Sequence, residues 1–180
     1  RLTVQLKVNG LRPVALSLDD YFINRADTPL DENGEYDFEA IEAIDLKLFN
    51  EHLLRILNGE AVEVPTYNFK LGEREYRGHI IQIDRNQPLI IEGIHGLNER
   101  LTTAVPHAHK VKIYISALTQ LSIDNHNRIP TTDTRLIRRI VRDNQFRSHD
   151  ALKTLSMWPS VRRGEERNIF PFQEDADIMF

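Results

Sequence analysis

Two apolar runs of this sequence each end in acidic residues. The stretch VALSLDDYF, residues 14–22, passes from strand-forming side chains to Asp19 and Asp20. The stretch PLIIEG, residues 88–93, ends at Glu92. Ligands of open parallel sheets bind beyond the carboxyl ends of the strands. Acids at those ends can hold Mg²⁺, directly or through water, or accept a proton from a substrate.

These acids also have a structural interpretation. Asp is common where a strand leaves the core and a turn begins, so Asp19 and Glu92 could each cap a turn. If the two strands are parallel neighbours, both acids lie at one edge of the sheet. The sequence leaves both interpretations open and makes the pair a candidate for metal binding and proton transfer.

Residues 132–147, TDTRLIRRIVRDNQFR, predict a helix that Thr132 or Asp133 can cap. Four arginines share one of its faces: Arg135, Arg138, Arg139 and Arg142. The other face is apolar: Leu136, Ile137, Ile140 and Val141. Guanidinium groups this close repel one another unless anions intervene, and they bind phosphate oxygens in a forked geometry. The alternative is a solvated face whose arginines pair with Asp and Glu from elsewhere.

Aromatic side chains provide a weaker signal. Tyr67 and Phe69 alternate on an expected strand beside Pro65, where they could stack on a base or only pack within a hairpin. Trp158 is typical of a packing anchor, and Arg162 and Arg163 close to it could add phosphate contacts.

The histidines are weaker candidates still. His95, close to Glu92, is either a substrate contact or a structural histidine. His107, His109 and His126 do not have a spacing typical of a metal site.

The elements that must position these residues alternate between strands and helices. Buried strands are expected at 13–18, 88–93 and 110–116, and helices at 37–57 and 95–101, with residues 23–36 as a loop. Residues 64–83 predict an antiparallel hairpin that turns near Leu71-Gly72. Asn9-Gly10 ends a first helix that already includes Arg1, and Asn58-Gly59 ends the second. This alternation predicts an α/β fold with a parallel sheet flanked by helices.

Composition limits the class of protein. The chain of 180 residues suits one domain, and its net charge of -4 does not favour nucleic-acid binding through a global positive field. It contains no cysteine, which excludes disulfides and thiolate metal sites. We find no segment apolar enough to span a membrane and no signal-peptide pattern, so we expect a soluble, cytoplasmic protein.

Six motifs follow one another along the chain: SLDDYF, YDFEAIEAID, VPTYNF, LIIEG, DTRLIRRIVRD and ADIMF. In their order and spacing they resemble the uridine kinase and phosphoribulokinase family of P-loop kinases, and most of all its bacterial uridine kinase-like branch. The resemblance implies a P-loop kinase-like α/β fold with an inserted β-hairpin and an arginine-rich lid helix. It also implies ATP and Mg²⁺ as cofactors and a small-molecule acceptor, with a homo-oligomer possible.

The resemblance assigns roles to particular residues. Asp19 would be the general base and lie near Mg²⁺, and Glu92 would be a second acid of the metal site. The lid arginines over the transferred phosphate would be Arg135, Arg138 and Arg142. The residues implied to bind the acceptor are, for the base, Tyr67 and Phe69, and for the ribose hydroxyls, either Glu39 or Asp37.

The sequence departs from the family pattern at two places. Uridine-cytidine kinases present a His to the pyrimidine after the hairpin motif, whereas this chain has KLGER there. The Gly-rich phosphate loop, expected just before residue 1 together with a central strand, is not among these residues. We therefore expect a single kinase-like domain over 1–180, truncated at both ends and inactive alone.

The function implied is ATP-dependent phosphoryl transfer to the hydroxyl of a nucleoside such as uridine. The alternatives are a kinase for another small alcohol or sugar phosphate, and a non-catalytic nucleotide-binding or regulatory module.

Overall fold

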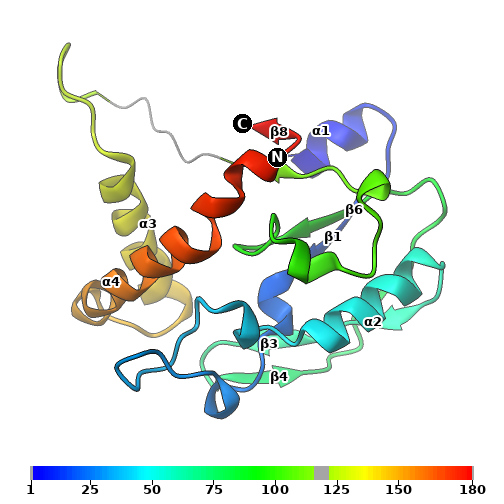
Figure 1. Cartoon of the computed structure of the whole chain (residues 1–180), viewed down its shortest axis with the longest axis horizontal. Coiled ribbons are helices and arrows are strands. Elements are labelled where there is room, and N and C mark those ends of the chain that lie inside the picture. Colours follow the sequence, from blue (N-terminus) through cyan, green and yellow to red (C-terminus); the bar gives the residue numbers. More distant parts are fainter. Residues whose placement is uncertain (1, 116–121, 180) are drawn as a thin grey trace.

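The structure, a computed structural model, describes residues 2–115 and 122–179 (Figure 1). The α-helices in this part of the chain are α1 (Leu2–Val8), α2 (Leu46–Leu57), α3 (Thr131–Phe146) and α4 (Ala151–Asn168). The strands are β1 (Val14–Ser17), β2 (Val62–Glu63), β3 (Thr66–Asn68), β4 (Glu73–Glu75), β5 (Ile80–Ile81), β6 (Leu89–Glu92), β7 (Ile113–Tyr114) and β8 (Ile178–Met179). Short 3-10 helices connect them: η1 (Leu18–Tyr21), η2 (Arg25–Asp27), η3 (Ile41–Ala43), η4 (Glu99–Thr102), η5 (His107–His109) and η6 (Phe170–Asp175).

Parallel strand pairing confirms the predicted α/β class. Strand β1 pairs with β6, with Ser17 opposite Glu92, and β7 pairs with β8, with Ile113 opposite Ile178. The connection between the two strands of each pair contains helices, as parallel pairing requires. Within residues 2–115 and 122–179 the two pairs are not hydrogen-bonded to each other.

The core forms where α2 packs against η1 and the end of β1, and Figure 1 shows α2 beside the turn that follows β1. Phe49, Leu53 and Ile56 are spaced four and three residues apart, so they share the buried face of α2. They pack with Leu16 and Leu18 at the end of β1. Burial of each such side chain stabilises the fold by about 1.5–3 kcal/mol. The strand end that carries Asp19 is thereby anchored to the core.

The second helix begins later than its sequence pattern predicts. We expected a helix over 37–57, but α2 begins at Leu46, where Asp45 caps it by accepting a hydrogen bond from the Leu48 amide at 3.0 Å. The preceding backbone bonds to another part of the chain, because the Ile23 amide donates to the Ala43 carbonyl and the Asp45 amide to the Tyr21 carbonyl. These bonds replace the helical ones, although the predicted end at Asn58-Gly59 is confirmed.

The hairpin prediction is confirmed. Strands β3 and β4 are antiparallel, with Tyr67 opposite Arg74, and residues around Leu71-Gly72 form the turn. Strand β2, before the hairpin, and strand β5, after it, form a second antiparallel pair. The hairpin carries Tyr67 and Phe69 toward the end of β1, because the Tyr67 amide donates to the Asp20 carboxylate at 3.2 Å.

Helices α3 and α4 lie side by side on one side of the β1–β6 pair (Figure 1). The arginine-rich helix α3 exists as predicted, but Pro130 precedes its first residue, and neither Thr132 nor Asp133 caps it. Its apolar face is incomplete, because Ile137 and Val141 are 60% and 50% exposed. The sequence pattern did not reveal α4, which has Pro159 in its interior.

The other predicted elements are shorter than expected. Of residues 95–101 only the end is helical, as η4, and of residues 110–116 only Ile113–Tyr114 are a strand, while Ser116 lies outside the described residues. Helix α1 runs to Val8 and is followed by Asn9-Gly10 as predicted, while Arg1 also lies outside the described residues. No helix of the described ranges is long and apolar enough to cross a membrane.

One carboxylate, that of Glu99, connects η4 to the residues before β7. It accepts from Lys110 at 2.6 Å and pairs with Lys112 at 2.5 Å, and the Lys112 side chain is only 6% exposed. The hydrogen bonds from the two ammonium groups lower the pKa of Glu99 to about 2. Because this pKa lies below its unfolded value, the stabilisation is present above about pH 4.5 and disappears as pH falls toward 2.

We predict that Glu99→Gln lowers the free energy of unfolding at pH 7 by about 2 kcal/mol, because the buried Lys112 ammonium loses its counterion while solvent still reaches position 99. Urea unfolding at pH 7 and pH 3 measures this, and the difference from the parent chain should shrink at pH 3. Glu60→Gln, which breaks an exposed pair with Arg55, is the matched control and should cost under about 1 kcal/mol. Equal effects of the two substitutions would contradict the prediction.

Candidate functional site

The parallel register brings the two predicted strand-end acids to the same edge of the β1–β6 pair. Glu92 ends β6 opposite Ser17, and Asp19 follows Ser17 by two residues in η1. The two chain segments meet closely at Gly93, where a Cβ atom would lie 2.6 Å from the Cβ of Leu18. Gly93 also has a φ of 152°, so a side chain there would be both strained and too close to Leu18.

Of the adjacent acids Asp19 and Asp20, only one is committed to a structural contact. Asp20 accepts the Tyr67 amide, and burial raises its pKa. Asp19 and Glu92, in contrast, accept no hydrogen bond and form no ion pair with any described residue. Their oxygens are therefore free to bind a ligand from solution.

These two carboxylates fit the way Mg²⁺ binds in phosphoryl-transfer sites. Mg²⁺ takes one or two protein carboxylates and completes its shell with water and phosphate oxygens. In the part of the chain that the structure describes, no three His, Cys, Asp or Glu residues are arranged to hold a metal by themselves. Asp19 and Glu92 could accordingly contribute part of a magnesium site, and phosphate oxygens the rest.

The arginines of α3 divide into paired and unpaired groups. Arg135 pairs with Glu165 of α4, and Arg139 donates to Asp143 at 2.9 Å. Both acids are almost completely buried, with exposed fractions of 2% and 1%. Arg138 and Arg142 have no carboxylate within 4.0 Å among the described residues. Two of the four arginines therefore pair with carboxylates, as the structural interpretation predicted, and the other two are available to bind phosphate.

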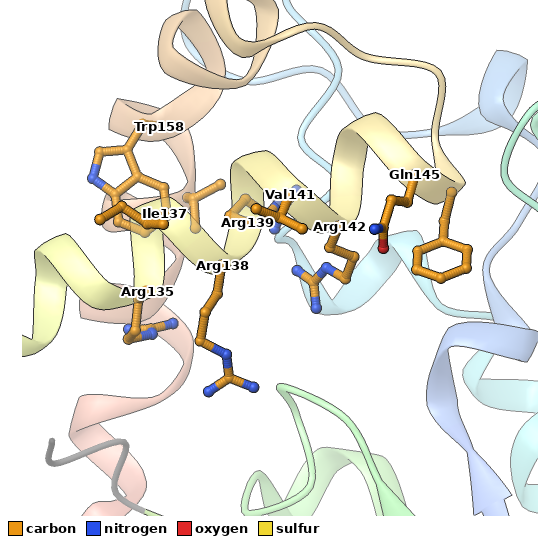
Figure 2. A pocket seen from close by; sticks show the side chains of 10 residues that line it. Arg135, Ile137, Arg138, Arg139, Val141, Arg142, Gln145 and Trp158 are labelled. Carbon is orange, nitrogen blue, oxygen red and sulfur yellow. The ribbon is translucent and has the colours of Figure 1, made fainter.

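Figure 2 shows Arg135, Arg138 and Arg142 extending from the same side of α3, away from Trp158. A cavity of 590 Å³ runs along this helix and is lined by all three arginines as well as by Trp158. Trp158 is half-buried between α3 and α4, as expected of a packing residue. The unpaired guanidinium groups are therefore accessible to an anion.

The arginine-rich helix faces the acid at the end of β1. Burial and the neighbouring Arg139 lower the pKa of Arg142, while the carboxylates of Asp143 and Asp19 oppose this change. Asp19 has the same influence on the pKa of Arg147, at the end of α3. The carboxylate of Asp19 is thus close enough to α3 to act electrostatically on Arg142 and Arg147.

Three aromatic rings form one wall of this site. Tyr67 and Phe69 lie 5.0 Å apart between ring centroids, and Phe22 lies 5.6 Å from Tyr67 and 6.3 Å from Phe69. The guanidinium of Arg147 sits 4.7 Å above the Phe69 ring. Tyr67 is buried within the cluster, whereas Phe69 is partly accessible.

Sequence reasoning missed Phe22 and Arg147 as members of this wall. Phe22 is part of the strand-end motif that suggested the site, but only the three-dimensional contact with the hairpin shows its place. Arg147 falls outside the spacing of the arginine stripe, five residues after Arg142. Its contact with Phe69 is visible only once the hairpin is seen to lie against the end of α3.

The two acids expected at the start of the long helix lie instead in the loop before η3, because α2 begins later. Asp37 accepts the Glu39 amide at 3.1 Å, which fixes the local turn. The side chain of Glu39 is 14% exposed and lies 4.0 Å from Arg139. Burial raises the pKa of Glu39, while Arg139 and Arg147 act in the opposite direction.

Arg162 and Arg163 both have carboxylate partners. Arg162 donates to Glu165 at 2.7 Å, and Arg163 pairs with Asp31 at 3.2 Å. The Arg162 pair lies within α4, whereas the Arg163 pair connects α4 to the loop that contains Asp31. A phosphate ligand would have to compete with these pairs.

His95 is fully buried in the loop after β6. Neither of its ring nitrogens has a hydrogen-bond partner in the described residues. Burial lowers its pKa to about 4, although the Glu42 carboxylate and the backbone of Ala40 and Glu39 act to raise it. The imidazole is therefore neutral near pH 7 and packs against the loop that carries Glu39.

The arrangement of strands and helices is that of P-loop kinases. One similar solved structure is a possible uridine kinase from Bacillus stearothermophilus, with a TM-score of 0.57 and 15% identity over 99% of this chain and 77% of that one. The YGR205w protein gives a TM-score of 0.58 and 15% identity over 97% of this chain and 72% of that one. These likenesses establish the fold class alone.

Sequence comparison is more specific. Residues 15–180 match the Phosphoribulokinase / Uridine kinase family. A uridine kinase of Bacillus pumilus is 29% identical over 175 residues, which cover 96% of this chain and 74% of the relative. A uridine kinase of Halobacterium salinarum is 24% identical over 171 residues, covering 94% and 68%. The chain belongs to the phosphoribulokinase/uridine kinase family, as its motifs suggested.

The buried imidazole of His95 gives a prediction about acid stability. Because its folded pKa of about 4 lies below the unfolded value of 6.5, the unfolded chain binds a proton first as the pH falls, and stability is lost between pH 6.5 and 4. The loss attributable to His95 is about 3 kcal/mol. Burial lowers the pKa of His52 too, so His52 adds a loss of the same sign.

We predict that His95→Leu flattens the dependence of the urea midpoint on pH between 7 and 5, whereas His107→Gln, at an exposed position, does not. His52 should contribute to the slope that remains in His95→Leu. An unchanged pH slope in His95→Leu would show that the histidine is not held neutral.

Proposed function

We propose that this chain is the greater part of an ATP-dependent kinase that phosphorylates a hydroxyl of a nucleoside. The observation that carries the proposal is that the hairpin contacts both the end of β1, through Asp20, and the end of α3, through Arg147, so that the free Asp19 lies near the arginine-rich helix. A proton acceptor and anion-binding groups are two of the components used in phosphoryl transfer to an alcohol.

In the proposed reaction Asp19 removes the proton of the acceptor hydroxyl. The hydroxyl oxygen bonds to the terminal phosphorus of ATP as the bond to ADP breaks. Arg138 and Arg142 neutralise charge on the transferred group, with Arg135 joining them only if it leaves Glu165. Mg²⁺, bound near Asp19 and Glu92, would neutralise charge on the ATP phosphates. Such catalysis depends mainly on positioning and electrostatic stabilisation.

The aromatic wall supports a nucleoside as the acceptor. Phe69 is partly accessible and meets Tyr67 and Phe22 edge-on, so a flat base would stack on the face of Phe69 opposite Arg147 or replace that guanidinium. Glu39, with Asp37 beside it, would bind ribose hydroxyls. No His follows the hairpin motif directly, so the chain offers no obvious contact specific for a pyrimidine, and the preferred base is a question for measurement.

We propose further that a strand with its phosphate loop, supplied from outside residues 2–179, joins the two parallel pairs into one sheet. The support is that these pairs are not hydrogen-bonded to each other within the described residues. On this proposal the 180 residues alone lack the phosphate cradle, and the protein acts in the cytoplasm, where ATP and nucleosides meet.

The test is phosphate transfer from ATP and Mg²⁺ to a panel of nucleosides, simple sugars and sugar phosphates, using the protein at its natural length beside the 180-residue chain. Transfer to a nucleoside by the longer protein is the expected result. Transfer only to a sugar or sugar phosphate would show that the acceptor is not a nucleoside. ATP binding without transfer to any compound would favour a regulatory module.

We predict that Asp19→Asn lowers kcat at least 100-fold in the natural-length protein, because the amide cannot accept the hydroxyl proton. ATP affinity, measured by calorimetry, should change less than threefold. Asp20→Asn is the neighbouring comparison and should act mainly on stability, because Asp20 accepts the Tyr67 amide. Near-normal turnover in Asp19→Asn would remove Asp19 from the mechanism.

We predict different outcomes for the arginines of α3. Arg142→Ala and Arg138→Ala should lower kcat about 100-fold with little change in Tm, because these side chains have no structural ion pair. Arg135→Ala should lower Tm, because it weakens the pairing of the buried Glu165. Rates and thermal melts, with the exposed Asn144→Ala as control, measure both. A low Tm in Arg142→Ala, or a normal one in Arg135→Ala, would contradict this division.

A further inference from the structure

Glu39 lies beneath the C-terminal half of α4, although it belongs to a loop more than a hundred residues earlier in the sequence. Its side chain is 14% exposed and approaches Arg139 of α3 at 4.0 Å. The loop therefore brings an acid to the place where both helices of the α3–α4 pair can contact it.

Gly164 permits this close approach. A Cβ atom at position 164 would lie 2.8 Å from the Cγ of Glu39, closer still to its Cβ, and 3.4 Å from its Oε2. Glycine within a helix is less favourable than alanine, so helix formation does not explain its presence in the middle of α4. Any side chain at this position must displace either Glu39 or the helix.

Asn168 makes a second contact from the same face of α4, one helical turn after Gly164. Its Nδ2 donates a hydrogen bond to the main-chain carbonyl of Glu39 at 2.8 Å. Helix α4 thus limits the side chain of Glu39 through Gly164 and holds its main chain through Asn168. Among the described residues, neither Gly164 nor Asn168 forms a hydrogen bond or ion pair with the strand-end acids or the aromatic wall.

We propose that Gly164 and Asn168 are positioning residues, through which helix α4 places the Glu39 carboxylate for the acceptor hydroxyls without touching the acceptor itself. The inference rests on the proposed function, in which Glu39 binds those hydroxyls. It assigns to α4 control of acceptor affinity, a role separate from the phosphate-binding role of α3.

The experiment compares Gly164→Ala and Asn168→Ala in the protein at its natural length, with Tm measured for each. Both should raise the KM of the acceptor at least tenfold and leave kcat at saturating acceptor, as well as the KM of ATP, within about twofold. Ser156→Ala, an exposed position two turns earlier on α4, is the matched control and should change neither constant.

A double-mutant cycle separates positioning of Glu39 from general damage to the helix. In a Glu39→Ala background, Gly164→Ala should change the acceptor KM by less than about twofold, because the residue it positions is already absent. If Gly164→Ala fails to fold, Asn168→Ala supplies the same comparison.

Two failures are distinguishable. If the parent protein transfers phosphate but the acceptor KM is unchanged in the single variants, or rises equally in the Glu39→Ala background, the inference alone is overturned. If the parent protein transfers phosphate to no acceptor, the proposed function is overturned together with the inference.

Discussion

The parallel pairing of β1 with β6 is the constraint on which the site depends. Because Ser17 lies opposite Glu92, both strands end at the same level, and Asp19 leaves the sheet beside Glu92. The packing of Leu16 and Leu18 against α2 fixes the strand from below, and Gly93 lets the second strand end approach Leu18 closely. A slip of one residue would turn Glu92 to the other face of the sheet.

Two buried acids form ion pairs in helices α3 and α4. Glu165 pairs with Arg135 and Arg162, and Asp143 pairs with Arg139 and Arg147. Burying a carboxylate costs free energy unless the carboxylate is paired, so these acids hold their arginines firmly. The paired arginines are then not available to bind an anion. Repulsion along the stripe is reduced as a result, and guanidinium groups remain available only where no buried acid lies within reach.

Sequence patterns predicted the parts of the fold that local chemistry determines. The strand ends at Asp19 and Glu92, the hairpin turn and the arginine-rich helix follow from residue type and spacing, and the structure contains all three. The start of α2 could not be predicted, because the Ala43 carbonyl and the Asp45 amide bond to Ile23 and Tyr21 rather than within a continuous α-helix. The pairing of Arg135 with Glu165 was equally hidden, because it depends on α4, whose interior Pro159 and Gly164 argue against a helix.

The features that obscured α4 in the sequence are connected with its place in the fold. Gly164 weakens the helix locally but lets it cross Glu39, and the neighbouring Glu165 buries its carboxylate against α3. Successive residues of one helix therefore contact the acid of the early loop and an arginine of the lid helix. A shift of the whole helix would disturb both contacts, whereas a change confined to Gly164 acts on Glu39 alone.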